Sequence, residues 1–303
     1  MKKYILFAMI IFLFFFGYNT KQNLNEEIED NILETQEVKF TKTTEKLSVN
    51  KKTEQEVKEI STEFNISEDE LSFEKYLPVL MFHYIEDISP SSSDQMRYKL
   101  SFSPQKLEQF LVFFKEHNIE TLTFWDLKEI IEGKKEFPKK AVMLTFDDGY
   151  KSHYDNAFSL LKKYNAKGVF FIISSKPDND LNYANWNQLK ELADDGQEIA
   201  SHTVSHSNLA NLSEVEIRNE LEISKNTIEE KIGKPVISLC YPAGKYDERV
   251  IETAKENYLF ARTTKLGKHF SFQKRYEIPI IRMFSTTGIA SLEIWFDEKP
   301  LKK

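Results

Sequence analysis

Two adjacent carboxylates, Asp147 and Asp148, follow an apolar run at the point where a buried strand is expected to end. The run Ala141–Phe146 has the length and composition of a strand, and Gly149 directly after the pair permits a sharp turn. Charged pairs rarely lie at the end of a buried strand unless something holds them there. Because Asp-Asp-Gly is also ordinary turn chemistry, both a plain turn and a reactive site stay open.

A pair of histidines, His202 and His206, follows a second predicted strand, Glu198–Ser201. Two imidazoles four residues apart face the same way if the segment turns helically, and they suit a divalent metal such as zinc. Chance surface polarity is the alternative interpretation. A carboxylate from another strand end would complete three protein ligands, the arrangement of a catalytic metal site. A structural zinc site with several cysteines is excluded, because Cys240 is the only cysteine.

Two more segments follow predicted strands. The first is YPAGKYD, Tyr241–Asp247, in which the proline and the glycine favour an irregular loop. Such a loop can present a backbone N–H to a developing oxyanion. A plain strand-to-helix turn is the simpler alternative. His83 ends the first predicted strand, where it is either a satisfied core residue or an acid or base. Two other histidines, His117 and His153, are predicted to be solvated.

The three motifs TFDDG, SHTVSH and YPAGKY, in this order, resemble those of the polysaccharide deacetylases of carbohydrate esterase family four, the NodB-homology domain. The resemblance covers roughly Pro78 to Phe284. It implies a distorted (β/α) barrel of seven strands and hydrolysis of the acetamide in polymers that contain N-acetylglucosamine. It also implies roles for single residues, with Asp147 as the general base, Asp148, His202 and His206 as metal ligands, and the Tyr241 N–H as the oxyanion donor.

Two departures from the family pattern are informative. Cys240 stands where most of the family has an arginine against the catalytic base, and no histidine follows Arg282 to act as the usual late acid. The subgroup that acts on poly-β-1,6-N-acetylglucosamine lacks that arginine and carries its acid histidine on the first strand, which VLMFHYI resembles. The resemblance therefore implies His83 as the acid, and Arg282 as a substitute partner of Asp147.

The leading hypothesis is therefore a metal-dependent de-N-acetylase. Its expected substrate is poly-β-1,6-N-acetylglucosamine, a biofilm polysaccharide. Zinc is the expected metal, with cobalt or nickel as alternatives. A peptidoglycan or chitooligosaccharide deacetylase is the alternative enzyme, and an inactive carbohydrate-binding domain is the alternative from another class. The sequence does not set the oligomeric state.

The elements that must position these residues alternate between strand and helix in a predicted domain of residues 76–303. Helices are expected from Pro104 to about His117, from a capping box at Ser213 to near Gly233, and at Glu248–Asn257. This alternation predicts an α/β fold with a mainly parallel sheet, open or closed into a barrel, whose chemistry gathers at the carboxyl ends of the strands. The predicted strands are Pro78–Phe82, Ala141–Phe146, Gly168–Ile173, Glu198–Ser201, Val236–Cys240, Leu259–Thr263 and Ile278–Met283.

The amino-terminal part has a different composition. Residues 1–20, with two lysines before the apolar stretch Tyr4–Tyr18, predict a signal peptide or a retained signal anchor. Residues 21–75 form a polar, charged linker. The domain is therefore expected outside the cytoplasmic membrane, secreted or tethered, with membrane contact only through the first segment. The net charge of −7 offers no basic surface for nucleic acid.

Overall fold

The computed structural model describes residues 73–296 of the chain. The predicted signal segment, residues 1–20, and all but the last three residues of the predicted linker, residues 21–75, lie outside the described residues. Within residues 73–296, no helix combines the length and the apolar character that crossing a membrane requires.

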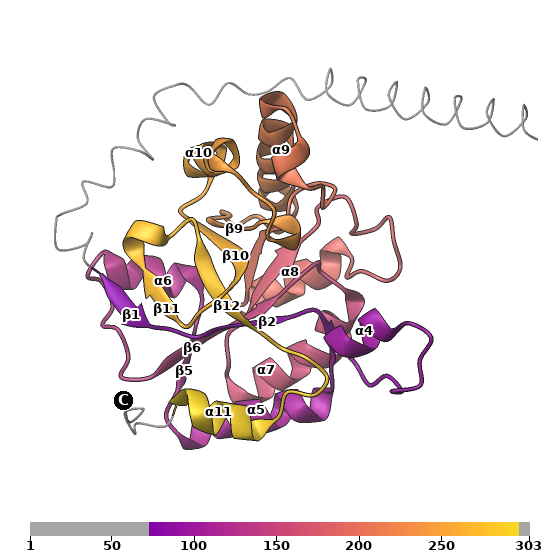
Figure 1. Ribbon diagram of the computed structural model, residues 1–303, viewed down its shortest axis with the longest axis vertical. Coiled ribbons are helices and arrows are strands. Elements are labelled where there is room, and N and C mark those ends of the chain that lie inside the picture. The colour runs from indigo at the N-terminus through magenta and orange to yellow at the C-terminus, as the bar shows by residue number, and fades with distance from the viewer. Residues whose placement is uncertain (1–72, 297–303) are drawn as a thin grey trace, which may run out of the picture. The chain divides into compact units, whose positions relative to one another are not determined.

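Seven parallel strands close into a barrel, which appears at the centre of Figure 1. Closure depends on β2, because this strand pairs with β12 on one side and with β6 on the other. The prediction of a parallel barrel is confirmed, and the open sheet is excluded. In order around the barrel the strands are β2 (Val79–Phe82), β12 (Ile278–Arg282), β10 (Phe260–Leu266), β9 (Ser238–Cys240), β8 (Glu198–Ser201), β7 (Val169–Ile172) and β6 (Ala141–Phe146).

Alternation along the strands separates two apolar cores. Val79 and Met81 belong to one cluster of buried side chains, whereas Leu80 and Phe82 belong to a second cluster together with residues of the surrounding helices. An eighth strand, β5 (Glu120–Leu122), pairs with the first half of β6, and β7 pairs with its second half. All six residues of β6 are buried, as expected for a strand covered on both faces.

Helices surround the barrel (Figure 1), and the three predicted ones are confirmed. The side chain of Ser103 caps the first of them, Ser213 and Glu216 form the predicted capping box of the second, and Gly233 ends that helix with a φ of 75°. The helices are α4 (Gln95–Leu100), α5 (Pro104–Glu116), α6 (Phe124–Ile131), α7 (Ser159–Tyr164), α8 (Trp186–Asp194), α9 (Glu214–Ile232), α10 (Glu248–Asn257) and α11 (Ile289–Phe296).

Short elements complete the domain. An antiparallel pair, β1 (Glu74–Tyr76) with β11 (His269–Ser271), and a parallel pair, β3 (Tyr84–Ile85) with β4 (Ser101–Phe102), lie beside the barrel. Between β6 and α7 the chain forms one π-helical segment, η1 (His153–Phe158). The remaining short segments are the 3₁₀ turns η2 (Leu209–Asn211), η3 (Pro242–Gly244) and η4 (Phe272–Lys274).

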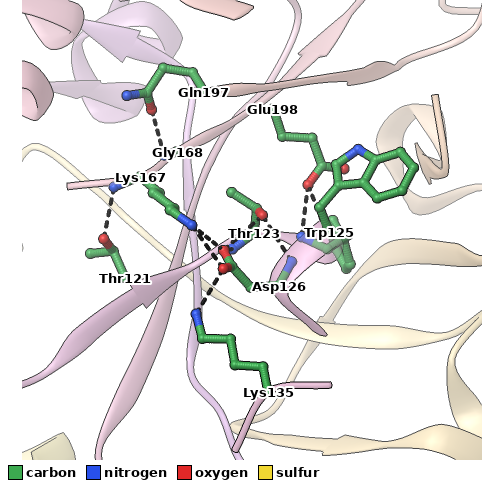
Figure 2. Close-up of polar contacts among 10 residues, drawn as sticks. Thr121, Thr123, Trp125, Asp126, Lys135, Lys167, Gly168, Gln197 and Glu198 are labelled. Atoms are coloured by element: carbon green, nitrogen blue, oxygen red, sulfur yellow. Dashed lines mark hydrogen bonds and ion pairs between the residues drawn. The ribbon is translucent and has the colours of Figure 1, made fainter. Parts of the chain in front are cut away.

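Charged side chains hold the amino-terminal end of the barrel together (Figure 2). Asp126 on α6 accepts hydrogen bonds from Lys135 and Lys167, both at 2.8 Å. The carboxyl group of Glu198, at the start of β8, accepts the N–H of Phe124 at 2.7 Å, which caps the amino terminus of α6. These contacts lie at the opposite end of the strands from the residues that the sequence marks as reactive.

Candidate active site

The predicted reactive residues gather at the carboxyl ends of the barrel strands. His83 directly follows β2, Asp147 and Asp148 follow β6, His202 follows β8, and Tyr241 follows β9. In parallel strands these ends lie at the same edge of the barrel, so four separate segments meet there. The arrangement brings together residues that are more than 150 positions apart in the sequence.

Asp148, His202 and His206 form a cluster that fits a divalent cation. The Oδ1 atom of Asp148 lies 3.3 Å from Nε2 of His202 and 3.5 Å from Nε2 of His206. One donor atom from each residue lies within 4.8 Å of the others. Asp148 and His202 are buried and His206 is partly exposed, so the cluster opens to solvent on one side. Two imidazoles and one carboxylate with an open side suit a catalytic metal.

The backbone around these ligands is fixed in an unusual conformation. Asp148, Thr203 and His206 have positive φ angles of 75°, 66° and 64°, a conformation that non-glycine residues seldom adopt. The Nδ1 atom of His202 lies 2.7 Å from the carbonyl oxygen of Cys240, a contact that leaves Nε2 directed at Asp148.

The turn between the two histidines is held from α9. One carboxylate oxygen of Glu220 accepts the N–H groups of Val204 and Ser205, each at 2.9 Å, and the other accepts the Ser205 hydroxyl at 2.6 Å. Within the turn, the N–H of His206 donates to the Thr203 hydroxyl at 3.1 Å. Glu220 was not identified from the sequence, where it is one of many glutamates on a charged helix.

The prediction that Arg282 pairs with Asp147 is wrong. The guanidinium of Arg262, on β10, forms the ion pair with Asp147, and its Nη2 also lies 2.9 Å from the sulfur of Cys240. Arg262 and Cys240 are direct neighbours on adjacent strands, so Arg262 reaches the base from the strand beside Cys240. Among the described residues, Arg282 forms no ion pair. The signal for Arg262 was its place inside the predicted strand Leu259–Thr263, since a buried arginine needs a partner.

His83 lies close to this group of charges. Burial lowers the pKa of His83, the carboxylates of Asp147 and Asp148 raise it, and the two nearby arginines lower it further. Its Nδ1 atom is buried and has no hydrogen-bond partner among the described residues. The prediction that His153 is solvated is wrong: the side chain is 1% exposed, and its Nε2 contacts the carbonyl oxygen of His83. His117 is exposed, as predicted.

The N–H of Tyr241, predicted as the oxyanion donor, already has a backbone partner. The N–H of Tyr241 donates to the carbonyl of Arg262 at 3.1 Å, which extends the β9–β10 ladder and leaves this group engaged. Pro242 has no N–H, and the N–H groups of Gly244 and Lys245 donate to carbonyls within the turn. The N–H of Ala243, where φ is 52°, makes no backbone hydrogen bond in the described part of the chain. Within the turn Tyr241–Lys245, it is the N–H group without a backbone partner.

Comparisons with known proteins agree with this geometry. The family model described as polysaccharide deacetylase matches residues 134–259. A Bacillus subtilis protein, YxkH, provisionally named a polysaccharide deacetylase, is 30% identical over 209 residues, which cover 68% of this chain and 71% of that protein. A Staphylococcus epidermidis protein named poly-beta-1,6-N-acetyl-D-glucosamine N-deacetylase is 26% identical over 80% of this chain and 92% of its own length.

Among solved structures, the Streptococcus pyogenes deacetylase PplD, in complex with acetate, superposes with a TM-score of 0.68. The two chains are 25% identical, and the match covers 75% of this chain and 99% of PplD. The match supports the barrel fold of the described residues.

Proposed function

The chain belongs to the polysaccharide deacetylase family, and on this premise we propose that it removes acetyl groups from N-acetylglucosamine units of an extracellular polysaccharide. The substrate that we propose is poly-β-1,6-N-acetylglucosamine. The observation that carries this proposal is the meeting of Asp148, His202 and His206 with Asp147 and His83 at one end of the barrel.

Asp148, His202 and His206 would hold the metal, and we propose zinc, because two imidazoles and one carboxylate suit it. Bound there, a divalent cation supplies Lewis acidity for the acetamide carbonyl and makes the attacking water more acidic. The carbonyl of Cys240 and the carboxylate of Glu220 keep the two histidines in place for this role.

The remaining steps belong to side chains and backbone of the same barrel end. Asp147, which is paired with Arg262, takes the proton of the attacking water. The N–H of Ala243 donates to the oxyanion that forms from the acetyl carbonyl. His83, in its protonated form, donates a proton to the leaving nitrogen, because an amide nitrogen is expelled poorly without one.

Several features favour the β-1,6-linked polymer over other acetylated glycans. The relative from Staphylococcus epidermidis is named for that polymer, and the match extends over 92% of its length. Cys240 replaces the arginine of the wider family, and Arg262 on the next strand supplies the positive charge instead. The predicted signal segment and linker support a location outside the cytoplasmic membrane, which is where such a polymer is found.

The test is acetate release by the full chain from poly-β-1,6-N-acetylglucosamine, with peptidoglycan and chitooligosaccharides in parallel. Each substrate is measured with and without a chelator, and with zinc added back. We expect release from the β-1,6 polymer that the chelator abolishes and zinc restores. Release from the other glycans alone would overturn the substrate but keep the reaction. Folded, zinc-loaded protein without release from any glycan would favour a carbohydrate-binding role.

A further inference from the structure

Three tyrosines form a continuous stack beside the metal ligands. The rings of Tyr84 and Tyr150 are stacked with centroids 4.0 Å apart, and the rings of Tyr150 and Tyr183 follow at 5.1 Å. The stack joins the short strand β3, which carries Tyr84, to the two loops that follow β6 and β7. Backbone hydrogen bonds from Lys151 to Asn182 and from Ala184 to Gly149 fix the last two loops to each other. We call Tyr84, Tyr150 and Tyr183 the tyrosine column.

The column lies on the side of the barrel mouth where Asp148 is found. Burial raises the pKa of each of the three phenols, and the negative charge of Asp148 adds to the increase. The hydroxyl of Tyr150 interacts with those of both neighbours. Among residues 73–296, the three hydroxyls form no hydrogen bond outside the column. The three side chains are half-buried, Tyr84 directly follows His83, and Tyr150 lies two residues after Asp148. Three phenols without a protein partner beyond themselves therefore lie beside the site.

The ends of the column are closed by cations that are themselves paired. The guanidinium of Arg97 lies 4.8 Å from the ring centre of Tyr84, and two hydrogen bonds of 2.7 Å tie it to Glu86. At the other end, the ammonium of Lys176 lies 5.1 Å from the ring centre of Tyr183 and 3.5 Å from Asp180. Stacking and these cations cover the ring faces, so the hydroxyl edges remain for a ligand.

We propose that the hydroxyl edge of the tyrosine column binds the hydroxyl groups of a neutral sugar unit of the substrate chain, next to the unit that reacts. An uncharged ligand fits because the two cations at the ends of the column, Arg97 and Lys176, are already paired with carboxylates. A sugar fits because its ring presents several hydroxyl groups that can both donate and accept along a row of phenols. This inference rests on the proposed function, and it identifies which wall of the site recognises the chain.

The test removes single hydroxyls and keeps the stack. The zinc-loaded full chain and its Tyr150→Phe and Tyr183→Phe variants are assayed for acetate release from a β-1,6-linked N-acetylglucosamine pentamer. We expect KM to rise about three- to tenfold in each variant, the loss of one neutral hydrogen bond, while kcat changes much less. Tyr154→Phe is the matched control, because its hydroxyl donates to Glu191 on α8 at 2.5 Å, away from the column.

A binding measurement separates failure of this inference from failure of the proposed function. Titration of the same pentamer into zinc-loaded Asp147→Asn protein, with and without the phenylalanine substitutions, gives dissociation constants without turnover. Weaker binding in both phenylalanine variants supports the column as a sugar site, even if the unsubstituted chain releases no acetate. An unchanged KM and an unchanged dissociation constant in both variants would overturn it, while acetate release by the unsubstituted chain would keep the proposed function.

Discussion

The guanidinium of Arg262 pairs with the carboxylate of Asp147 inside the mouth of the barrel, and both side chains are almost completely buried, at 0% and 3% exposure. The plane of the guanidinium also approaches the ring of Phe171, with its central carbon 5.0 Å from the ring centre. Burying a carboxylate in such a place is costly unless it has a positive partner. Arg262 is therefore the residue on which a catalytic base at position 147 depends.

Replacement of Arg262 by methionine should abolish most of the activity. Asp147 would then be a buried carboxylate without a partner, which leaves an uncompensated charge inside the barrel and disturbs the position of the base. We expect the free energy of unfolding to fall by about 3–5 kcal/mol, and urea unfolding and acetate release measure the two effects. Arg262→Lys, which keeps the positive charge, should recover part of the activity and part of the stability. It replaces the methionine variant in the test if that variant does not fold.

The matched control is Arg282→Met, the arginine at the end of the neighbouring strand β12. It forms no ion pair in residues 73–296, so its loss should leave the unfolding free energy nearly unchanged. Equal losses of unfolding free energy in the two variants would contradict the assignment of Arg262 as the partner of Asp147.

Much of the fold could be predicted because hydrophobic pattern and capping residues are local signals. The bounds of β6 and β8 match the predicted strands to the residue, and α10 begins after its predicted cap, Asp247. Strand ends also indicated where reactive side chains should meet. This rule placed a carboxylate and a histidine pair at one edge of the barrel, and the family resemblance then implied Asp148, His202 and His206 as the ligands.

The errors concern neighbours that only the closed barrel determines. Arg262 and Arg282 both lie on predicted strands, and the choice between them depends on which strand lies beside Cys240. The N–H of Tyr241 is engaged because β9 and β10 are adjacent, a relation that the sequence does not contain. His153 follows a turn and looks solvated, yet the π-helical segment turns its ring inward against Phe146 and Phe170.

Replacement of His83 by alanine should lower kcat by about 10²- to 10⁴-fold, the usual contribution of a general acid. Zinc affinity should stay the same, because His83 lies outside the Asp148–His202–His206 cluster. Acetate release and zinc content of the purified variant are measured together, with the exposed His117→Gln as the control. A large loss of zinc in His83→Ala would mean that this histidine is a ligand instead.

Replacement of Glu220 by glutamine should weaken zinc binding by about 10- to 100-fold. The amide can accept fewer of the three hydrogen bonds that Glu220 receives from Val204 and Ser205, so the turn that carries the two histidines loosens. Competition with a chromogenic chelator measures the dissociation constant. Glu222→Gln, on the same helix and paired with Arg218, is the control. Unchanged zinc affinity, with kcat reduced, would place Glu220 in substrate binding.

Glu198 should make stability depend on pH at the end of the barrel opposite the metal site (Figure 2). Burial raises the pKa of Glu198 from 4.5 to about 7, although hydrogen bonds from Ser238 and from the backbone of α6 lower it. Because the folded state holds this proton more tightly than the unfolded state, the stabilisation is fully present below pH 4.5 and is lost as pH rises through about 7. The difference between a pKa of 4.5 and one of about 7 corresponds to about 3 kcal/mol of folding free energy.

Glu198→Gln has no proton to lose, so its unfolding free energy should lack this decrease. Urea unfolding of both proteins at intervals between pH 5 and pH 8 gives the difference in stability as a function of pH, and the difference should move in favour of the variant as pH rises. Titration of the metal-site histidines affects both proteins equally and cancels, since Glu198 lies at the other end of β8 from His202. The exposed Glu214→Gln is the control, and a difference that stays constant across this range would show that Glu198 is ionised in the folded protein throughout.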